Sequence, residues 1–101
     1  MGVLPRSADF SYEANVPEIS RFFGIIIAMY YDDHAPPHFH VRYGEQKAII
    51  AIETIGILRG QLSQKALALV SEWAAEHQDE LRADWALARQ QAPLRSIAPL
   101  E

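Results

Sequence analysis

The longest apolar segment of the chain covers residues 22–31 and reads Phe-Phe-Gly-Ile-Ile-Ile-Ala-Met-Tyr-Tyr. The segment is rich in β-branched and aromatic residues, is apolar on both faces and is too short for a typical helix, so it predicts a central β-strand. Pro36 and Pro37 follow it closely. Because proline lacks the N–H group that a sheet ladder needs, we expect the strand to end before them.

An alternating segment, residues 38–43, follows the prolines and predicts a second strand. One face would carry His38, His40 and Arg42, and the other would carry Phe39, Val41 and Tyr43, which we expect to point into the core. A turn at residues 44–46 leads to a third predicted strand at residues 47–53, so these two strands should form a hairpin. A short fourth strand at residues 57–59 would complete an antiparallel meander.

The C-terminal half has a helical period. Ser63 is suited to cap a helix whose apolar positions follow the i, i+3, i+4, i+7 spacing. Asp79 could cap a second helix, although a single kinked helix over residues 64–89 fits the same pattern. Residues 93–100 are bounded by prolines and predict an extended tail that could add an edge strand. The fold class is therefore α+β: a small, mainly antiparallel sheet of three to five strands, with one or two C-terminal helices packed on one face.

Residues 1–16 show neither a helical nor a strand period, and they predict an N-terminal arm. The arm is expected to be foreign to the native product or disordered, and the alternative is an arm that packs on a neighbouring subunit. Residues 17–101 are expected to form a single α+β domain. A chain of 101 residues can bury roughly two-thirds of its unfolded surface around one core.

Composition narrows the possible functions. The net charge of −4 provides no global positive field, so any contact with RNA would have to be local. The absence of cysteine excludes disulfides, thiolate zinc sites and cysteine nucleophiles. The longest apolar run has about half the length of a membrane span, and no signal sequence is recognisable, so we expect a cytoplasmic protein without membrane contact. Phosphate-binding and serine-hydrolase motifs are absent.

The most suggestive segment is residues 32–40, where Asp32 and Asp33 are followed by three of the four histidines of the chain. Histidine exchanges protons near neutral pH and is the commonest metal ligand. The first hypothesis is RNA cleavage without a metal or other cofactor, in which His38 and His40 transfer protons and Arg42 stabilises the charge on the phosphate. The binding surface beside them would be lined by Tyr30, Tyr31, Asp33 and His34. Of these, the two tyrosines and His34 could stack a base or donate protons.

Two alternatives use the same segment differently. His34, His38 and His40, or the two latter histidines with a carboxylate of Asp32 or Asp33, could hold zinc or another divalent metal with an open coordination position. In the third interpretation the histidines and acids only satisfy backbone groups, and the surface binds a protein partner.

Several segments together resemble a known family. They are residues 17–25 (Pro-Glu-Ile-Ser-Arg-Phe-Phe-Gly-Ile), residues 29–34 (Met-Tyr-Tyr-Asp-Asp-His), residues 37–40 (Pro-His-Phe-His), Trp73 with His77, and the closing residues 93–100. The chain resembles the small bacterial proteins grouped as domain of unknown function 4160. That family often accompanies a small protein of domain of unknown function 2442, which implies a toxin–antitoxin-like two-gene module.

The resemblance assigns no role to any residue. It leads us to expect a component of such a module that acts through the histidine-rich strand and loop. The sharper expectation is a metal-independent endoribonuclease toxin. The alternatives are a non-catalytic antitoxin and a divalent-metal-binding protein. The expected partner is the small neighbouring protein, with RNA or a second copy of the chain as further options.

Overall fold

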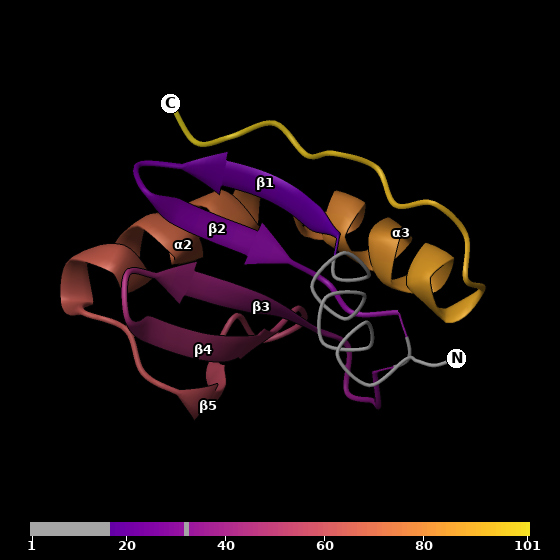
Figure 1. Cartoon of the computed structure of the whole chain (residues 1–101), viewed down its shortest axis with the longest axis horizontal. Coiled ribbons are helices and arrows are strands. Elements are labelled where there is room, and N and C mark those ends of the chain that lie inside the picture. Colours follow the sequence, from indigo (N-terminus) through magenta and orange to yellow (C-terminus); the bar gives the residue numbers. More distant parts are fainter. Residues whose placement is uncertain (1–16, 32) are drawn as a thin grey trace, which may run out of the picture.

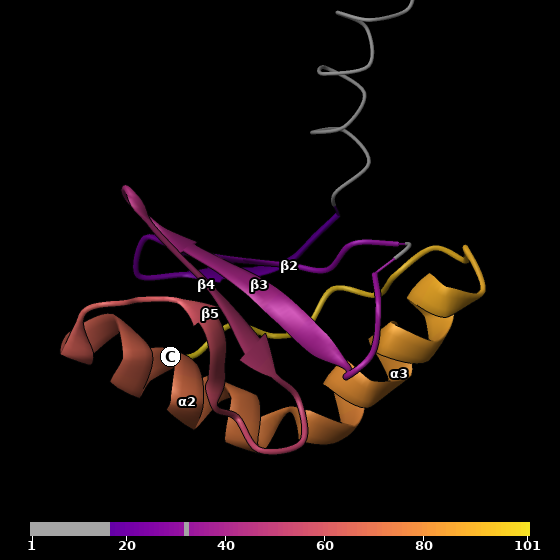
Figure 2. The ribbon, with the colours of Figure 1, turned by 90° about the horizontal axis from the view of Figure 1, so that it is seen from below.

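Five strands follow one another along the chain and pair in the same order in one antiparallel sheet (Figure 1). The strands are β1 (Glu18–Phe22), β2 (Ile25–Ala28), β3 (His38–Tyr43), β4 (Gln46–Ala51) and β5 (Ile57–Gly60), and they precede the helices α2 (Gln64–Glu76) and α3 (Gln78–Arg89). Both helices lie on one face of the sheet (Figure 2). This computed structural model describes residues 17–31 and 33–101, so the predicted arm at residues 1–16 lies outside the described residues. The α+β meander with C-terminal helices is confirmed.

The prediction of one central strand over residues 22–31 is wrong. The chain reverses at Phe23 and Gly24, so the apolar segment supplies the end of β1 and all of β2. Both turn residues have positive φ, 50° and 80°, as the favoured two-residue hairpin turns require. Phenylalanine is an atypical residue for such a turn, and the apolar pattern continued through it without interruption. Gly24 was the only local signal of the reversal.

The remaining strands lie close to their predicted positions. The third predicted strand is shorter than expected, because β4 ends at Ala51 and residues 52–54 form a turn. The predicted short strand is β5, which extends to Gly60. Gly60 has a φ of +82°, and a Cβ atom there would lie 2.2 Å from the carbonyl oxygen of Lys47. Only glycine allows this close approach of β5 to β4.

Two separate helices form, and not one kinked helix. Ser63 caps α2 as predicted, because its hydroxyl accepts a hydrogen bond from the Ala66 N–H at 3.2 Å. The prediction that Asp79 caps the second helix is wrong, since the N-cap of α3 is His77. Asp79 lies in the first turn of α3, where its charge suits the positive end of the helix dipole.

The C-terminal tail is extended but is not a strand. It runs along the outer edge of β1 (Figure 1), where it makes one backbone hydrogen bond to the strand, from Ile97 N–H to the Ile19 carbonyl at 2.7 Å. The tail is otherwise held by the helices, because the Trp73 indole N–H donates to the Ala98 carbonyl at 2.8 Å. A tail anchored through side chains has no regular ladder, which explains why no edge strand forms.

The core lies between the sheet and the helices. Phe39 and Val41 of β3 point into it as predicted and are almost fully buried, whereas Tyr43 is only partly buried at its margin. Trp73 of α2 is fully buried at the centre, with its ring 5.9 Å from that of Phe39 and 5.4 Å from that of Phe22. The opposite face of β3, which carries His40 and Arg42, points away from the helices, except at the start of the strand, where His38 contacts Trp85 of α3.

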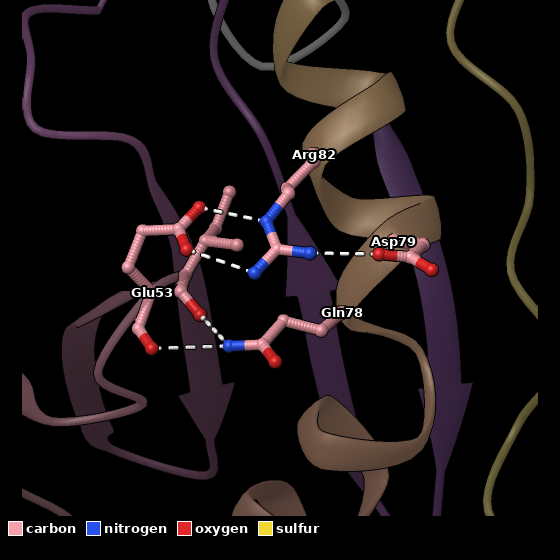
Figure 3. Close-up of polar contacts among 5 residues, drawn as sticks. Glu53, Gln78, Asp79 and Arg82 are labelled. Carbon is pink, nitrogen blue, oxygen red and sulfur yellow. Dashed lines mark hydrogen bonds and ion pairs between the residues drawn. The ribbon is translucent and has the colours of Figure 1, made fainter.

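A polar cluster fastens α3 to the segment that follows β4 (Figure 3). Arg82 donates two hydrogen bonds to the Glu53 carboxylate, at 2.8 and 2.9 Å, and one to Asp79 at 2.7 Å. Gln78 donates to the backbone carbonyl of Ile52 at 2.6 Å. The ion pairs are exposed and contribute little to stability individually, but they connect α3 to the segment that follows β4. No helix in the described part of the chain is long and apolar enough to cross a membrane.

Candidate metal centre

Asp33 brings the two strand histidines together. Its Oδ2 atom lies 2.9 Å from Nε2 of His38 and 2.9 Å from Nε2 of His40. The alternation of β3 places both histidines on one face, and the connection between β2 and β3, which contains the cis Ala35–Pro36 peptide, brings Asp33 back over them. The three atoms lie within 4.8 Å of one another, and within the described residues this is the only such convergence of three potential ligands.

The side chain of His38 is buried, and its ring has defined contacts with Trp85, Pro36 and Asp33. Its side chain is only 8% exposed, and its ring lies 5.2 Å from the Trp85 ring of α3. Its Nδ1 atom lies 2.7 Å from the carbonyl oxygen of Pro36. Because a carbonyl oxygen only accepts hydrogen bonds, Nδ1 must carry a hydrogen and donate it. This contact fixes the orientation of the ring and aims Nε2 at Asp33.

His40 is the more accessible histidine, with 21% of its side chain exposed. Its ring stacks on Tyr30, with the ring centroids 3.9 Å apart and the planes only 12° from parallel. The His38 ring approaches it edge-on at 5.3 Å. Asp33, His38 and His40 thus form a cluster in which Tyr30 orients the outer histidine, while Trp85 and Pro36 orient the inner one.

Asp33 is ionised in this setting. Partial burial tends to raise the pKa of its carboxyl, but the hydrogen bonds from His40 and His38, together with their charge, outweigh burial and hold the pKa below its usual value. A carboxylate with two imidazoles directed at one of its oxygens is a strong site for a positive charge, either protons on the rings or a metal ion.

The other residues predicted for the site are dispersed. Arg42 is exposed at the next position of β3 on the same face as His40, and both line a groove on the sheet. Tyr31 is partly buried against the core. His34 is exposed and is not part of the group formed by Asp33, His38 and His40. Asp32 lies outside the described residues.

Sequence reasoning missed two supports of the cluster. One is Trp85, because no local pattern connects it with His38, which is 47 positions earlier in the chain. The Pro36 carbonyl was also missed, because a backbone acceptor leaves no trace in side-chain patterns. The adjacency of Pro36 and His38 was the only available signal, since a residue two positions away is within reach of a histidine ring.

Comparison with known proteins identifies a family. The model of the family described as Domain of unknown function (DUF4160) matches residues 24–86, more than half of the chain. The match includes all three residues of the cluster and Trp85. No curated protein and no solved structure matches the chain significantly.

Proposed function

The chain belongs to this family of domains of unknown function, and we propose from its own site that it binds a divalent metal ion through Asp33, His38 and His40. The observation that carries the proposal is the pair of contacts made by His38. Its Nδ1–H is donated to the Pro36 carbonyl at 2.7 Å, while Nε2 lies 2.9 Å from the Asp33 carboxylate.

The two contacts of His38 require an extra positive charge. A neutral imidazole has one N–H and one lone pair, so with Nδ1–H donated to Pro36 its Nε2 lone pair would face the lone pairs of Asp33. Either a second proton on His38 or a cation between Nε2 and the carboxylate relieves this repulsion. Ligating histidines in proteins almost always donate their other N–H to a carbonyl or carboxylate, as His38 does.

The donor set suits several divalent ions. Two imidazoles and one carboxylate form the facial set found in non-haem iron sites, and three protein ligands with an open position also describe catalytic zinc sites. Zinc lies about 2.0–2.2 Å from such atoms, which places neighbouring ligands about 3–3.5 Å apart. Asp33 lies 2.9 Å from each histidine and all three atoms lie within 4.8 Å of one another, so an ion would be admitted by adjustments of the side chains.

The contacts of His38 also argue against RNA cleavage in which this histidine transfers protons without a metal. Both ring nitrogens of His38 have partners, and its side chain is 8% exposed. This ring is therefore better suited to binding a metal ion than to exchanging protons with a substrate. His40 is the accessible member of the pair. The geometry therefore favours the metal-binding interpretation over the pair of acid and base that the sequence suggested.

The proposal predicts that each chain binds one ion and that the affinity for the ion depends strongly on Asp33, His38 and His40. Calorimetric titration of metal-free protein with Zn²⁺ and Mn²⁺ should give saturable binding. Asp33→Asn should weaken it at least about tenfold, since even the loss of groups that support a ligand costs 10- to 100-fold in affinity. His34→Gln is the matched control, because His34 belongs to the same loop and is exposed.

Two results would contradict this assignment. One is binding weaker than about 1 mM for both ions, which corresponds to only about 4 kcal/mol of binding free energy. The other is an equal loss of affinity in the His34 and Asp33 variants. Cobalt(II) absorption provides a second measurement, because ligation by Asp33, His38 and His40 would change the visible spectrum in the wild type and not in Asp33→Asn.

At the cellular level, we infer a role in a toxin–antitoxin-like two-gene module with a small protein partner. The partly exposed His40 and the exposed Arg42, on the sheet face that points away from the helices, support an active or partner-binding role for that face. An endoribonuclease toxin and an antitoxin that covers another protein remain the two candidate roles. A homodimer is compatible with either.

Growth after induction of this protein alone in bacteria distinguishes the two roles. A toxin should arrest growth, and His40→Ala, expressed at the same level, should relieve the arrest because it removes the accessible ligand of the cluster. Integrity of total RNA is the accompanying readout. Normal growth with the wild-type protein would exclude an autonomous toxin and favour the antitoxin role.

A further inference from the structure

The two helices cover one face of the sheet and leave the other open (Figure 2). Residues of the open face line a groove of about 530 Å³. Four of the nine lysine and arginine residues of the chain line it, namely Arg21, Arg42, Lys47 and Arg59, together with one acidic residue, Glu18. Five acidic residues, by contrast, lie within residues 72–84, on or between the helices. A chain with a net charge of −4 therefore concentrates positive charge on one surface.

The positions of these cations follow from the sheet register. Arg42 and Lys47 lie directly opposite each other on β3 and β4, an arrangement that like charges disfavour. Arg21 is paired with Glu18 at 2.7 Å. The other three cations have no carboxylate partner within residues 17–31 and 33–101; they are Arg42, Lys47 and Arg59. The groove thus holds three cations that no described acidic side chain neutralises.

We propose that this groove binds single-stranded nucleic acid, with successive phosphates on Arg42, Lys47 and Arg59. Neighbouring strands lie about 4.8 Å apart and same-face residues about 7 Å apart, so the cations form an extended track and not a point. Arginine is suited to bidentate phosphate contacts. Ile26 and Ile49 add apolar surface to the groove, and a charged groove with apolar or aromatic surface for the bases is the usual basis of single-strand binding.

The groove that contains these cations extends to the proposed metal site. Tyr30 and His40 line the same groove and stack on each other. A nucleic-acid strand bound in the groove would therefore reach His40, the outer residue of the proposed metal site. The placement of a phosphate at the ion rests on the proposed function. Binding along Arg42, Lys47 and Arg59 does not, because these residues take no part in the cluster.

The test is fluorescence anisotropy with a labelled 12-nucleotide oligouridine, a DNA strand of the same length and an oligoglutamate peptide. The variant Arg42→Gln with Lys47→Gln should weaken nucleic-acid binding at least about tenfold. It should also lower the salt-dependence slope by roughly 1.4, since each phosphate that a cation neutralises contributes about 0.7. The control, Lys65→Gln with Arg95→Gln, removes the same charge from exposed positions outside the groove. It should bind like the wild type.

Preference between the RNA and DNA strands identifies the natural ligand, and either result agrees with the proposal. The proposal is overturned if the wild type binds neither strand at low salt, if both double variants lose affinity equally, or if the peptide binds more tightly than either strand. The last result would identify an acidic protein as the partner.

Repeating the titrations with chelator and with Asp33→Asn separates this inference from the proposed function. Nucleic-acid binding that persists in both shows that the groove acts without the metal, even if no ion binds to the cluster. Binding that disappears in both would overturn the assignment to the three cations.

Discussion

Replacement of Trp73 by alanine is expected to lower the free energy of unfolding by about 3–5 kcal/mol, the usual range for a buried aromatic residue. Trp73 is fully buried and lies against both Phe22 and Phe39. Its indole N–H also holds the tail through Ala98. The substitution therefore opens a cavity at the junction of sheet, helix and tail, and leaves the Ala98 carbonyl without its donor.

Urea denaturation followed by circular dichroism measures this loss. Trp73→Phe, which preserves part of the volume, should lose less and keeps the test informative if the alanine variant does not fold. Leu58→Ala is the control, because Leu58 is 49% exposed and substitutions at such sites usually change stability by less than about 0.5 kcal/mol. A loss below about 1 kcal/mol in Trp73→Ala would contradict the central place of this residue.

The second large effect is expected at Asp33. In the presence of chelator, Asp33→Ala should lower the free energy of unfolding by about 1–3 kcal/mol near neutral pH, because it leaves Nε2 of the buried His38 without a partner. The effect should depend on pH in a defined direction. The folded protein holds the pKa of Asp33 below its ordinary value of 3.8, so the native state binds this proton less tightly than the unfolded state.

A lowered carboxyl pKa contributes stability that is fully present above the unfolded pKa and is lost as the pH falls through the folded pKa. The difference between wild type and Asp33→Ala should therefore be full at pH values above 3.8 and shrink as the pH falls below that value. Glu18→Ala is the comparison, since its carboxylate pairs with Arg21 on the surface and such pairs contribute little. A difference at Asp33 that grows as the pH falls from 5 to 2 would contradict the cluster.

The first hairpins show which structural features the local hydrophobic pattern predicts and which it does not. The alternation in residues 38–43 correctly predicted β3 and the inward direction of Phe39 and Val41, because period-2 alternation is a direct consequence of strand geometry. Phe23 and Gly24 show where it fails. An apolar residue at a turn carries no polar signal, and the reversal becomes visible only through the pairing of β1 with β2.

For the candidate site formed by Asp33, His38 and His40, too, one part follows from the sequence and another from the tertiary structure. The sequence by itself determined which chemistry was available: histidines and acids within nine residues, two of those histidines on one strand face, and a chain without cysteine. It also determined the α+β class, because hydrophobic periodicity is a local property of the chain.

Only the tertiary structure decided which of these groups meet. Asp33 reaches both strand histidines while His34 stays outside the group, Trp85 closes the inner side of His38 from a distant helix, and Arg59 joins Arg42 and Lys47 on one face. Convergence at the level of an ångström depends on loop path, sheet register and helix placement. These are set by packing over the whole molecule, and no local stretch of sequence encodes them.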